Sequence, residues 1–127
     1  MLRNLPNYHY VEAPTTTCKF VFQMDDQEKM EYGQQVRQHF ADTVEAVKKY
    51  HAKLLVMDEV LDAVAMGMLS DEALAEFLRN RPEDLEVVMT GRAPTPCTDP
   101  LADYITRMQK VRHPFDKGLN ARLGVEF

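Results

Sequence analysis

The chain has 127 residues, with 20 acidic and 15 basic side chains and a formal net charge of −5. This length suits one domain, and no apolar run approaches the roughly 20 residues of a membrane-spanning helix. Basic residues cluster only within residues 107–127, which argues against nonspecific binding to nucleic-acid phosphates. The composition therefore predicts a single domain, residues 1–127, that binds neither nucleic acid nor a membrane.

The cysteines and the N-terminus indicate a reducing compartment. Cys18 and Cys97 lie far apart and match neither a zinc-ligand spacing nor a disulfide framework. The opening stretch MLRNLPNYHY contains no apolar segment of the kind that a secretory signal needs. We therefore expect reduced thiols and a cytoplasmic location.

Short β-like runs alternate with helical stretches along the chain, an order that predicts an α/β fold with a largely parallel sheet flanked by helices. Strands are expected at residues 8–13, 19–22, 53–59, 86–91 and 104–111. KLLVMDE and EVVMTG are mainly apolar, which is typical of central strands buried on both faces.

The first expected helix runs from Asp25 to about His51. Asp25 and Glu28 have the spacing of a capping box. Apolar residues then recur at spacings of four, four and three; they are Val36, Phe40, Val44 and Val47.

Three further helical stretches follow. VLDAVAM, from Val60, predicts a short helix that ends at Gly67. Ser70 is a good N-cap for a helix over residues 71–80, which Pro82 would terminate. Asp99 and Pro100 fit the N-cap and first position of a short helical turn.

Several catalytic chemistries lack their motifs. Ser70 is the only serine, and no G-x-S-x-G elbow occurs around it. The four histidines show no zinc-ligand spacing. The five glycines form neither G-x-G-x-x-G nor G-x-x-x-x-G-K, so no phosphate-binding loop of either type is present in the sequence.

Asp58 and Glu59 end the apolar run LLVM. Carboxylates in this position lie at the carboxyl edge of a parallel sheet, where ligands of open α/β folds bind. Mg²⁺ is commonly held by one or two carboxylates together with nucleotide phosphates. The pair therefore suggests a Walker B magnesium site, and an acidic residue that only caps the following helix is the competing interpretation.

Three stretches in order extend this interpretation. They are LLVMDEVLDAVAMGMLS, FLRNRPEDLEVVMTGR and LADYITRMQKVRHPFDKGLNARLGVEF, within residues 54–127. Their order and spacing resemble those of the P-loop type of ATP-dependent corrinoid adenosyltransferase. The resemblance implies a truncated P-loop NTPase-like (RecA-like) fold, with a three-layer, mostly parallel sheet flanked by helices.

The resemblance also implies the reaction and its substrates, ATP and a corrinoid such as cobalamin. Cobalt in the Co(I) state would attack C5′ of ATP and displace triphosphate. No protein nucleophile has to be activated, which agrees with the absence of such motifs. The protein would hold the substrates in line and neutralise charge on the leaving triphosphate.

Particular residues match the family's functional positions. Asp58 and Glu59 match its Walker B pair, which implies that they hold or orient Mg²⁺ on the phosphates. Arg92, in TGR, matches the family's arginine at the nucleotide site, where a guanidinium can bind phosphate oxygens bidentately. A solvated loop arginine is the alternative for Arg92.

The tail RHPFDKGLNARLGVEF matches the family's C-terminal signature. Lys117 is expected at the nucleotide, and other signature residues are expected to face the corrinoid. The second group comprises His113, Phe115, Asp116, Gly118 and Arg122. A structural tail that covers the sheet edge is the competing account.

The sequence departs from the family pattern at its start. Family members begin with a strand and a Walker A loop, whose amides and lysine bind the phosphates, and neither occurs here. Their absence predicts exposed strand edges and apolar faces. Three explanations fit this departure. The chain is a fragment or has a misassigned start, it is a short homologue completed by a partner, or it rebuilds a smaller sheet from residues 8–13 and 19–22.

Two functions follow from these alternatives. One is adenosyl transfer, with this chain alone expected to be nearly inactive without a phosphate-binding loop. The other is a non-catalytic module that binds a corrinoid or another subunit. The resemblance also suggests a homodimer, or a partner chain that completes the sheet.

Overall fold

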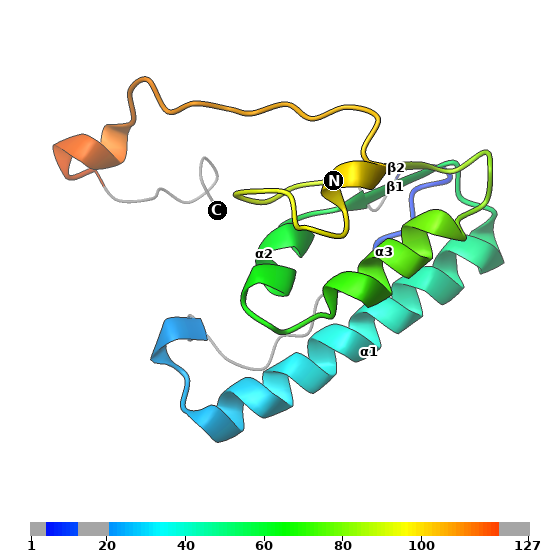
Figure 1. The fold of residues 1–127 in the computed structure, drawn as a ribbon, viewed down its shortest axis with the longest axis horizontal. Coiled ribbons are helices and arrows are strands. Elements are labelled where there is room, and N and C mark those ends of the chain that lie inside the picture. The colour runs from blue at the N-terminus through cyan, green and yellow to red at the C-terminus, as the bar shows by residue number, and fades with distance from the viewer. Residues whose placement is uncertain (1–4, 13–20, 120–127) are drawn as a thin grey trace.

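The computed structural model describes residues 5–12 and 21–119, apart from the side chain of Phe22. Figure 1 shows its helices and two strands. The elements are η2 (Val21–Gln23), α1 (Asp26–Tyr50), β1 (Leu54–Met57), α2 (Val60–Ala65), α3 (Asp71–Arg79), β2 (Glu86–Met89), η3 (Asp99–Leu101) and η4 (Pro114–Lys117), where η denotes a 3₁₀ helix. Within the described ranges, no helix is both long and apolar enough to cross a membrane.

Helix α1 confirms the prediction made from its capping residues. The Asp25 carboxylate accepts a hydrogen bond from the Glu28 N–H at 2.8 Å, and the Glu28 carboxylate accepts one from the Asp25 N–H at 3.0 Å. This reciprocal pair satisfies two backbone donors at the start of the helix. At the other end, His51 adopts the left-handed conformation with φ 50° and closes the helix.

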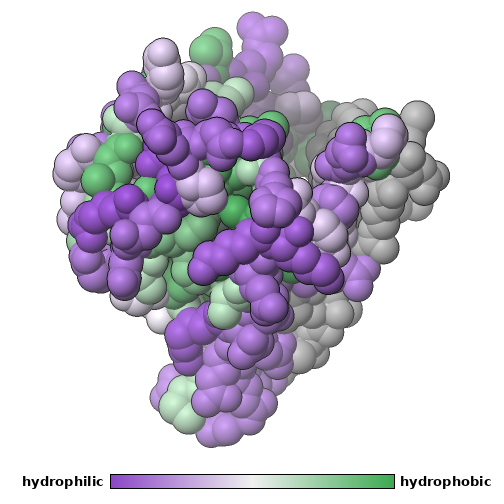
Figure 2. All heavy atoms as spheres, turned by 90° about the vertical axis from the view of Figure 1, so that its right-hand side faces the viewer, coloured by the Kyte–Doolittle hydropathy of each residue, from purple (hydrophilic) through white to green (hydrophobic). Residues whose placement is uncertain are grey.

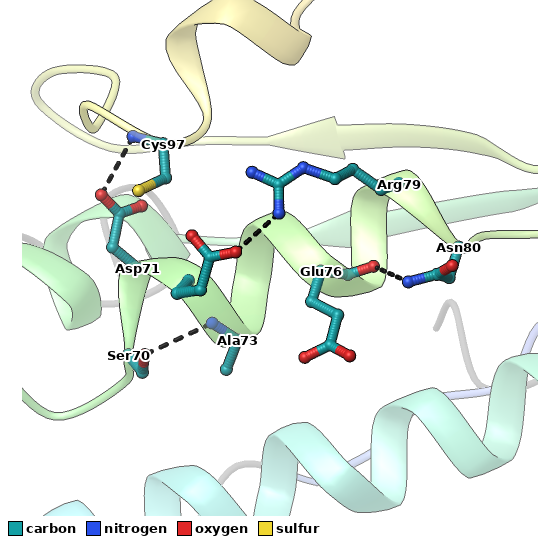
Figure 3. Close-up of polar contacts among 8 residues, drawn as sticks. Ser70, Asp71, Ala73, Glu76, Arg79, Asn80 and Cys97 are labelled. Atoms are coloured by element: carbon teal, nitrogen blue, oxygen red, sulfur yellow. Dashed lines mark hydrogen bonds and ion pairs between the residues drawn. The ribbon is translucent and has the colours of Figure 1, made fainter.

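The prediction for α3 is confirmed, and the one for the helical turn at Asp99 is partly wrong. The Ser70 hydroxyl accepts a hydrogen bond from the Ala73 N–H at 3.3 Å and so caps α3 (Figure 3). At the later turn, Thr98 takes the N-cap position and Asp99 is already helical. The turn is shifted by one residue because Thr98 is held by hydrogen bonds to Thr95.

Strands β1 and β2 form a parallel two-stranded sheet, in which Leu54 is paired with Glu86 and Met57 with Met89. Helices α1, α2 and α3 all lie to one side of it (Figure 1). The shared core contains the buried side chains of Met57, Leu61, Leu69 and Leu74. Phe40 of α1 meets Phe77 of α3 edge to face, with ring centroids 5.9 Å apart.

The expectation that both strands are buried on both faces is wrong for the described structure. Leu55 and Met57 of β1 face the helices together with Val87 and Met89 of β2. The alternate residues, Leu54, Val56 and Val88, are 59%, 58% and 45% exposed. The prediction of exposed apolar faces is thus confirmed. A small α/β fold is also confirmed, whereas a three-layer arrangement is not seen in the described residues.

Three predicted strands are absent from the described residues. Residues 8–12 are irregular, Val21–Gln23 is a 3₁₀ helix, and residues 104–111 have no regular structure. Ala13, Lys19 and Phe20, which completed the first two predictions, lie outside the described ranges, as does Cys18. A strand requires a hydrogen-bonded neighbour, and none of these segments pairs with β1 or β2.

The first described segment lies on α1 instead of joining the sheet. The His9 ring stacks on Tyr50 with centroids 3.6 Å apart, so residues 8–12 border an open cleft on α1. On the face shown in Figure 2, apolar atoms gather at the centre of the view and hydrophilic residues surround them. Part of the apolar interior is therefore visible at the surface on this side of the molecule.

Candidate nucleotide site

Asp58 and Glu59 follow directly from the carboxyl end of β1, as predicted. Both residues are exposed, and Val60 of α2 comes next in the chain. Glu59 has a left-handed backbone with φ 55°, a conformation that L-residues other than glycine adopt only occasionally. The left-handed residue turns the chain sharply from the strand into the helix, so both carboxylates lie at the sheet edge.

Thr90 links these carboxylates to the neighbouring strand end. Its hydroxyl donates to Asp58 Oδ1 at 2.6 Å and accepts from the Glu59 N–H at 2.8 Å. Its backbone N–H donates to the Met57 carbonyl at 3.2 Å, and its carbonyl accepts from the Leu61 N–H at 3.3 Å. The Thr90 hydroxyl therefore orients the Asp58 carboxylate and supports the turn at Glu59.

Arg92 lies one residue beyond Gly91 and is held at the same edge through Asp62. Its backbone N–H donates to Asp62 Oδ1 at 3.4 Å, and its Nε lies 4.0 Å from the same oxygen. The Arg92 side chain is 90% exposed, whereas that of Asp62 is 18% exposed. Asp62 thus holds the backbone of Arg92 and leaves the guanidinium open to solvent.

The donor set at this edge fits a magnesium ion bound through nucleotide phosphates. Among the described residues, neither Asp58 Oδ2 nor the Glu59 carboxylate has a hydrogen-bond or ion-pair partner. The same part of the chain contains no cluster of three or more metal-ligating side chains. Mg²⁺ needs no such cluster, because it keeps several waters and takes one or two carboxylates plus phosphate oxygens.

The loop that follows Arg92 is anchored to the start of α3. The Thr95 hydroxyl donates to Asp71 Oδ1, and the Cys97 N–H donates to Asp71 Oδ2 at 3.1 Å (Figure 3). Thr95 and Thr98 are buried, and their hydroxyl oxygens lie 2.6 Å apart. This network ties residues 95–98 to the N-terminal turn of α3.

The same network shifts the acidities of its members. Desolvation raises the pKa of Asp71, but hydrogen bonds from Thr95 and Cys97 outweigh it and hold that pKa below its ordinary value. Hydrogen bonding to Asp71 raises the pKa of the Cys97 thiol, and desolvation adds to this increase. Cys97 therefore remains a thiol at neutral pH and is not an activated nucleophile.

Replacing Asp71 with asparagine is expected to lower the free energy of unfolding at pH 6 by about 1 to 2 kcal/mol, since hydrogen bonds to a charged group are lost. The Asp71 pKa is lower in the folded than in the unfolded chain. The charged Asp71 therefore stabilises the fold fully above its pKa in the unfolded chain, about 3.9. This stabilisation is lost as the pH falls through the pKa of Asp71 in the folded chain. Urea titrations at pH 6 and pH 3 measure both effects.

The exposed Asp103→Asn variant serves as the control for the loss of one carboxylate. The difference between the Asp71→Asn variant and the natural chain should shrink at pH 3, whereas Asp103→Asn should match the natural chain at both values. A difference for Asp71→Asn that is equally large at pH 3 would contradict a charged Asp71 as the hydrogen-bond acceptor.

The described tail residues do not join Asp58, Glu59 and Arg92. His113 Nδ1 accepts from the Phe115 N–H at 3.1 Å, and Gly118, with φ 76°, closes the turn η4. Asp116 pairs with Lys110 at 2.7 Å. Phe115 is 70% exposed, and Lys117 is exposed. Element η4 lies apart from the strands (Figure 1), and Arg122 lies outside the described residues.

Sequence reasoning did not identify Thr90 and Asp62 as parts of the site. The sequence pattern shows Thr90 only as a strand residue and Asp62 only as part of a short helix. The available signal is positional: Thr90 directly follows the strand that is paired with the one preceding Asp58. Asp62 lies in the first turn of α2, which follows Glu59 directly, so its place near the carboxylate pair could also be read from the sequence.

Comparison with known proteins agrees with the motifs. The sequence model described as ATP:corrinoid adenosyltransferase BtuR/CobO/CobP matches residues 1–127. The corrinoid adenosyltransferase of Escherichia coli K12 is 27% identical, with 98% of this chain and 63% of the relative aligned. Corrinoid adenosyltransferase CobA of Salmonella typhimurium is 28% identical over the same shares.

A third relative has a higher identity over a shorter stretch. The corrinoid adenosyltransferase of Pseudomonas aeruginosa is 38% identical over 58% of this chain and 36% of its own length. The chain spans about 63% of the length of the Escherichia coli and Salmonella relatives. The match over all 127 residues shows that the chain belongs to the BtuR/CobO/CobP family of ATP:corrinoid adenosyltransferases.

Proposed function

We propose that this chain forms part of the ATP site of an enzyme that transfers the 5′-deoxyadenosyl group of ATP to the Co(I) centre of a corrinoid. The observation behind the proposal is the arrangement of Asp58, Glu59 and Thr90 at the carboxyl edge of the sheet. Ligands of open α/β sheets bind at this edge. The relatives named corrinoid adenosyltransferases support the choice of substrates.

In the proposed site, Asp58 and Glu59 hold Mg²⁺ directly or through its waters. Thr90 directs one oxygen of Asp58 toward itself, which leaves the second oxygen for the ion or its waters. Mg²⁺ supplies positive charge that stabilises the triphosphate as it leaves. Glu59 needs no role as a base, because no water is activated in this transfer.

Arg92 is proposed to bind phosphate oxygens through its exposed guanidinium. During the reaction, an electron pair of cobalt forms the bond to C5′ while the C5′–O bond breaks, and triphosphate leaves with the bonding electrons. The transfer moves no proton to or from a protein side chain. The work of Arg92 is therefore positioning and charge neutralisation.

The tail is proposed to supply further contacts to the substrates. Lys117 would bind the triphosphate, and the remaining signature residues would face the corrinoid; they are His113, Phe115, Asp116, Gly118 and Arg122. We also propose that residues 1–127 form a single domain and that β1 and β2 belong to a larger, three-layer P-loop-like sheet in the working assembly. A homodimer in the cytoplasm is the proposed state.

Titration of the purified chain with ATP, with and without Mg²⁺, tests the proposed site. We expect Mg²⁺-dependent binding with a Kd of about 1 mM, close to −4 kcal/mol, because the sequence lacks the loop amides and lysine of a Walker A motif. Isothermal titration calorimetry at high protein concentration measures this range. Equal binding with and without Mg²⁺, or none at either condition, would overturn the assignment of Asp58 and Glu59.

An anaerobic assay with chemically reduced cobalamin and Mg-ATP tests the activity of the chain. We expect negligible formation of adenosylcobalamin, followed by absorbance, since the phosphates are weakly held. Turnover at about 1 s⁻¹ or faster, an ordinary enzymatic rate, would contradict this expectation. It would also exclude the alternative of a non-catalytic module.

A further inference from the structure

Arg92 lies in the loop of residues 90–98, and a carboxylate from each of two helices holds this loop. Asp62, in the first turn of α2, accepts a hydrogen bond from the Arg92 N–H at 3.4 Å. Asp71, the first residue of α3, accepts one from the Thr95 hydroxyl and another from the Cys97 N–H at 3.1 Å (Figure 3). The two carboxylates therefore fix the loop on either side of residues 93 and 94.

Asp71 is the stronger of the two anchors. Both of its carboxylate oxygens accept hydrogen bonds from the loop, whereas the bond to Asp62 is longer than the usual N–H···O distance of about 2.9 Å. Thr95 and Thr98, at this end of the loop, are 6% and 1% exposed, and their hydroxyl oxygens lie 2.6 Å apart. Movement of this end would leave buried polar groups without partners, which is costly. Residues 95–98 therefore have a fixed place beside α3.

The position of Thr95 is transmitted to Arg92 through a short and stiff connection. Only Ala93 and Pro94 lie between the two residues, and the proline ring restricts its backbone to a φ of about −65°. The Arg92 side chain is 90% exposed, so packing against neighbours does little to hold its guanidinium. The region that the guanidinium can reach therefore depends mainly on the backbone of residues 92–95.

We propose that Asp71 is a positioning residue for ATP binding, which acts by fixing the loop that carries Arg92. The Asp71 carboxylate itself would not touch the triphosphate, because both of its oxygens already bind the loop and two anions repel each other. A guanidinium that is held in place binds phosphate more tightly than one that the ligand must first order. This inference rests on the proposed function, in which Arg92 binds phosphate oxygens.

A pair of variants at Thr95 tests the anchor without changing any charge. Thr95→Val keeps the shape of the side chain but removes the hydroxyl that donates to Asp71, and Thr95→Ser retains a hydroxyl. In amide NMR spectra recorded without nucleotide, the Arg92 signal of Thr95→Val should shift and its heteronuclear NOE should fall, whereas the signals of Asp58 and Glu59 should stay unchanged. Thr95→Ser should match the natural chain. An unchanged Arg92 signal in Thr95→Val, or equal changes at all three residues, would overturn the proposal.

Titration with Mg-ATP, followed through the same amide signals, tests the effect on binding. Asp71→Ala and Thr95→Val should each raise the Kd about fivefold, because the nucleotide then has to order the loop that carries Arg92. Thr95→Ser should bind as the natural chain does. Circular dichroism checks that each variant remains folded, and Thr95→Val carries the test by itself if Asp71→Ala does not fold.

Ser70→Ala is the control for a general loosening of α3. The Ser70 hydroxyl caps the same end of this helix by accepting from the Ala73 N–H. Its loss destabilises that end but leaves the hydrogen bonds between Asp71 and the loop in place, so this variant should bind Mg-ATP as the natural chain does. A loss of affinity as large as that of Asp71→Ala would overturn the proposal, because binding would then require a stable α3 and not the anchored loop.

The natural chain separates failure of this inference from failure of the proposed function. If the natural chain binds Mg-ATP, and Asp71→Ala and Thr95→Val bind it equally well, only the positioning role of Asp71 is overturned. If the natural chain shows no binding of Mg-ATP, the proposed function is overturned, and the role of Asp71 in nucleotide binding is overturned with it.

Discussion

Replacing Gly91 with alanine is expected to lower the free energy of unfolding by about 3 kcal/mol or more, the combined cost of backbone strain and overpacking. A Cβ added at Gly91 would lie 2.6 Å from the Leu61 Cβ and 3.2 Å from the Asp62 nitrogen. Its φ of 154° is also rarely adopted by L-residues. Relief of this clash would move Thr90 and Arg92 away from α2, so the candidate site should be disturbed together with the fold.

Gly67→Ala is the matched control for this prediction. Gly67 also has a positive φ, of 73°, but nothing lies within 4 Å of an added Cβ. The free energy of unfolding of this control should therefore fall by only about 1 kcal/mol, the cost of a left-handed backbone at an alanine. Urea denaturation of both variants measures the difference, and equal losses would show that close packing against Leu61 is not the reason for glycine at residue 91.

Replacing Asp58 or Arg92 with alanine is expected to abolish detectable binding of Mg-ATP. For Asp58, the variant loses the carboxylate that is oriented by Thr90. For Arg92, it loses a guanidinium that is 90% exposed, so stability should change little. Since the Kd of the natural chain for Mg-ATP is expected to be about 1 mM, even a tenfold loss of affinity places binding outside the range of calorimetry.

Two further variants separate the functional role from a general charge effect. Thr90→Val keeps the shape of the side chain but removes the hydroxyl between Asp58 and Glu59, so Mg²⁺-dependent binding should weaken although both carboxylates remain. Glu83→Ala removes an exposed carboxylate away from this edge and should bind as the natural chain does. Unchanged titration curves for Asp58→Ala and Arg92→Ala would show that the family roles do not transfer to these residues.

The local elements could be predicted because their signals lie within a few residues of each other. The capping box of Asp25 and Glu28 marks the start of α1, and Ser70 marks the start of α3. These bonds form between residues three apart, so they depend little on the rest of the chain. The apolar runs before Asp58 and Thr90 likewise identified β1 and β2.

The failed strand predictions concern segments whose structure depends on distant partners. Residues 8–12 and 104–111 contain β-prone residues, yet neither segment pairs with β1 or β2. A strand gains its hydrogen bonds only from a neighbour, and context can outweigh β propensity.

The sequence by itself determined the family, the main helices and the two carboxylates at the end of β1, since these depend on motifs and on contacts between near neighbours. Only the tertiary structure decided that Thr90 bridges Asp58 and Glu59 and that Asp62 holds the backbone of Arg92. These contacts join residues about thirty positions apart. They exist because parallel pairing of β1 with β2 brings the two strand ends to one edge, and no local pattern encodes that pairing.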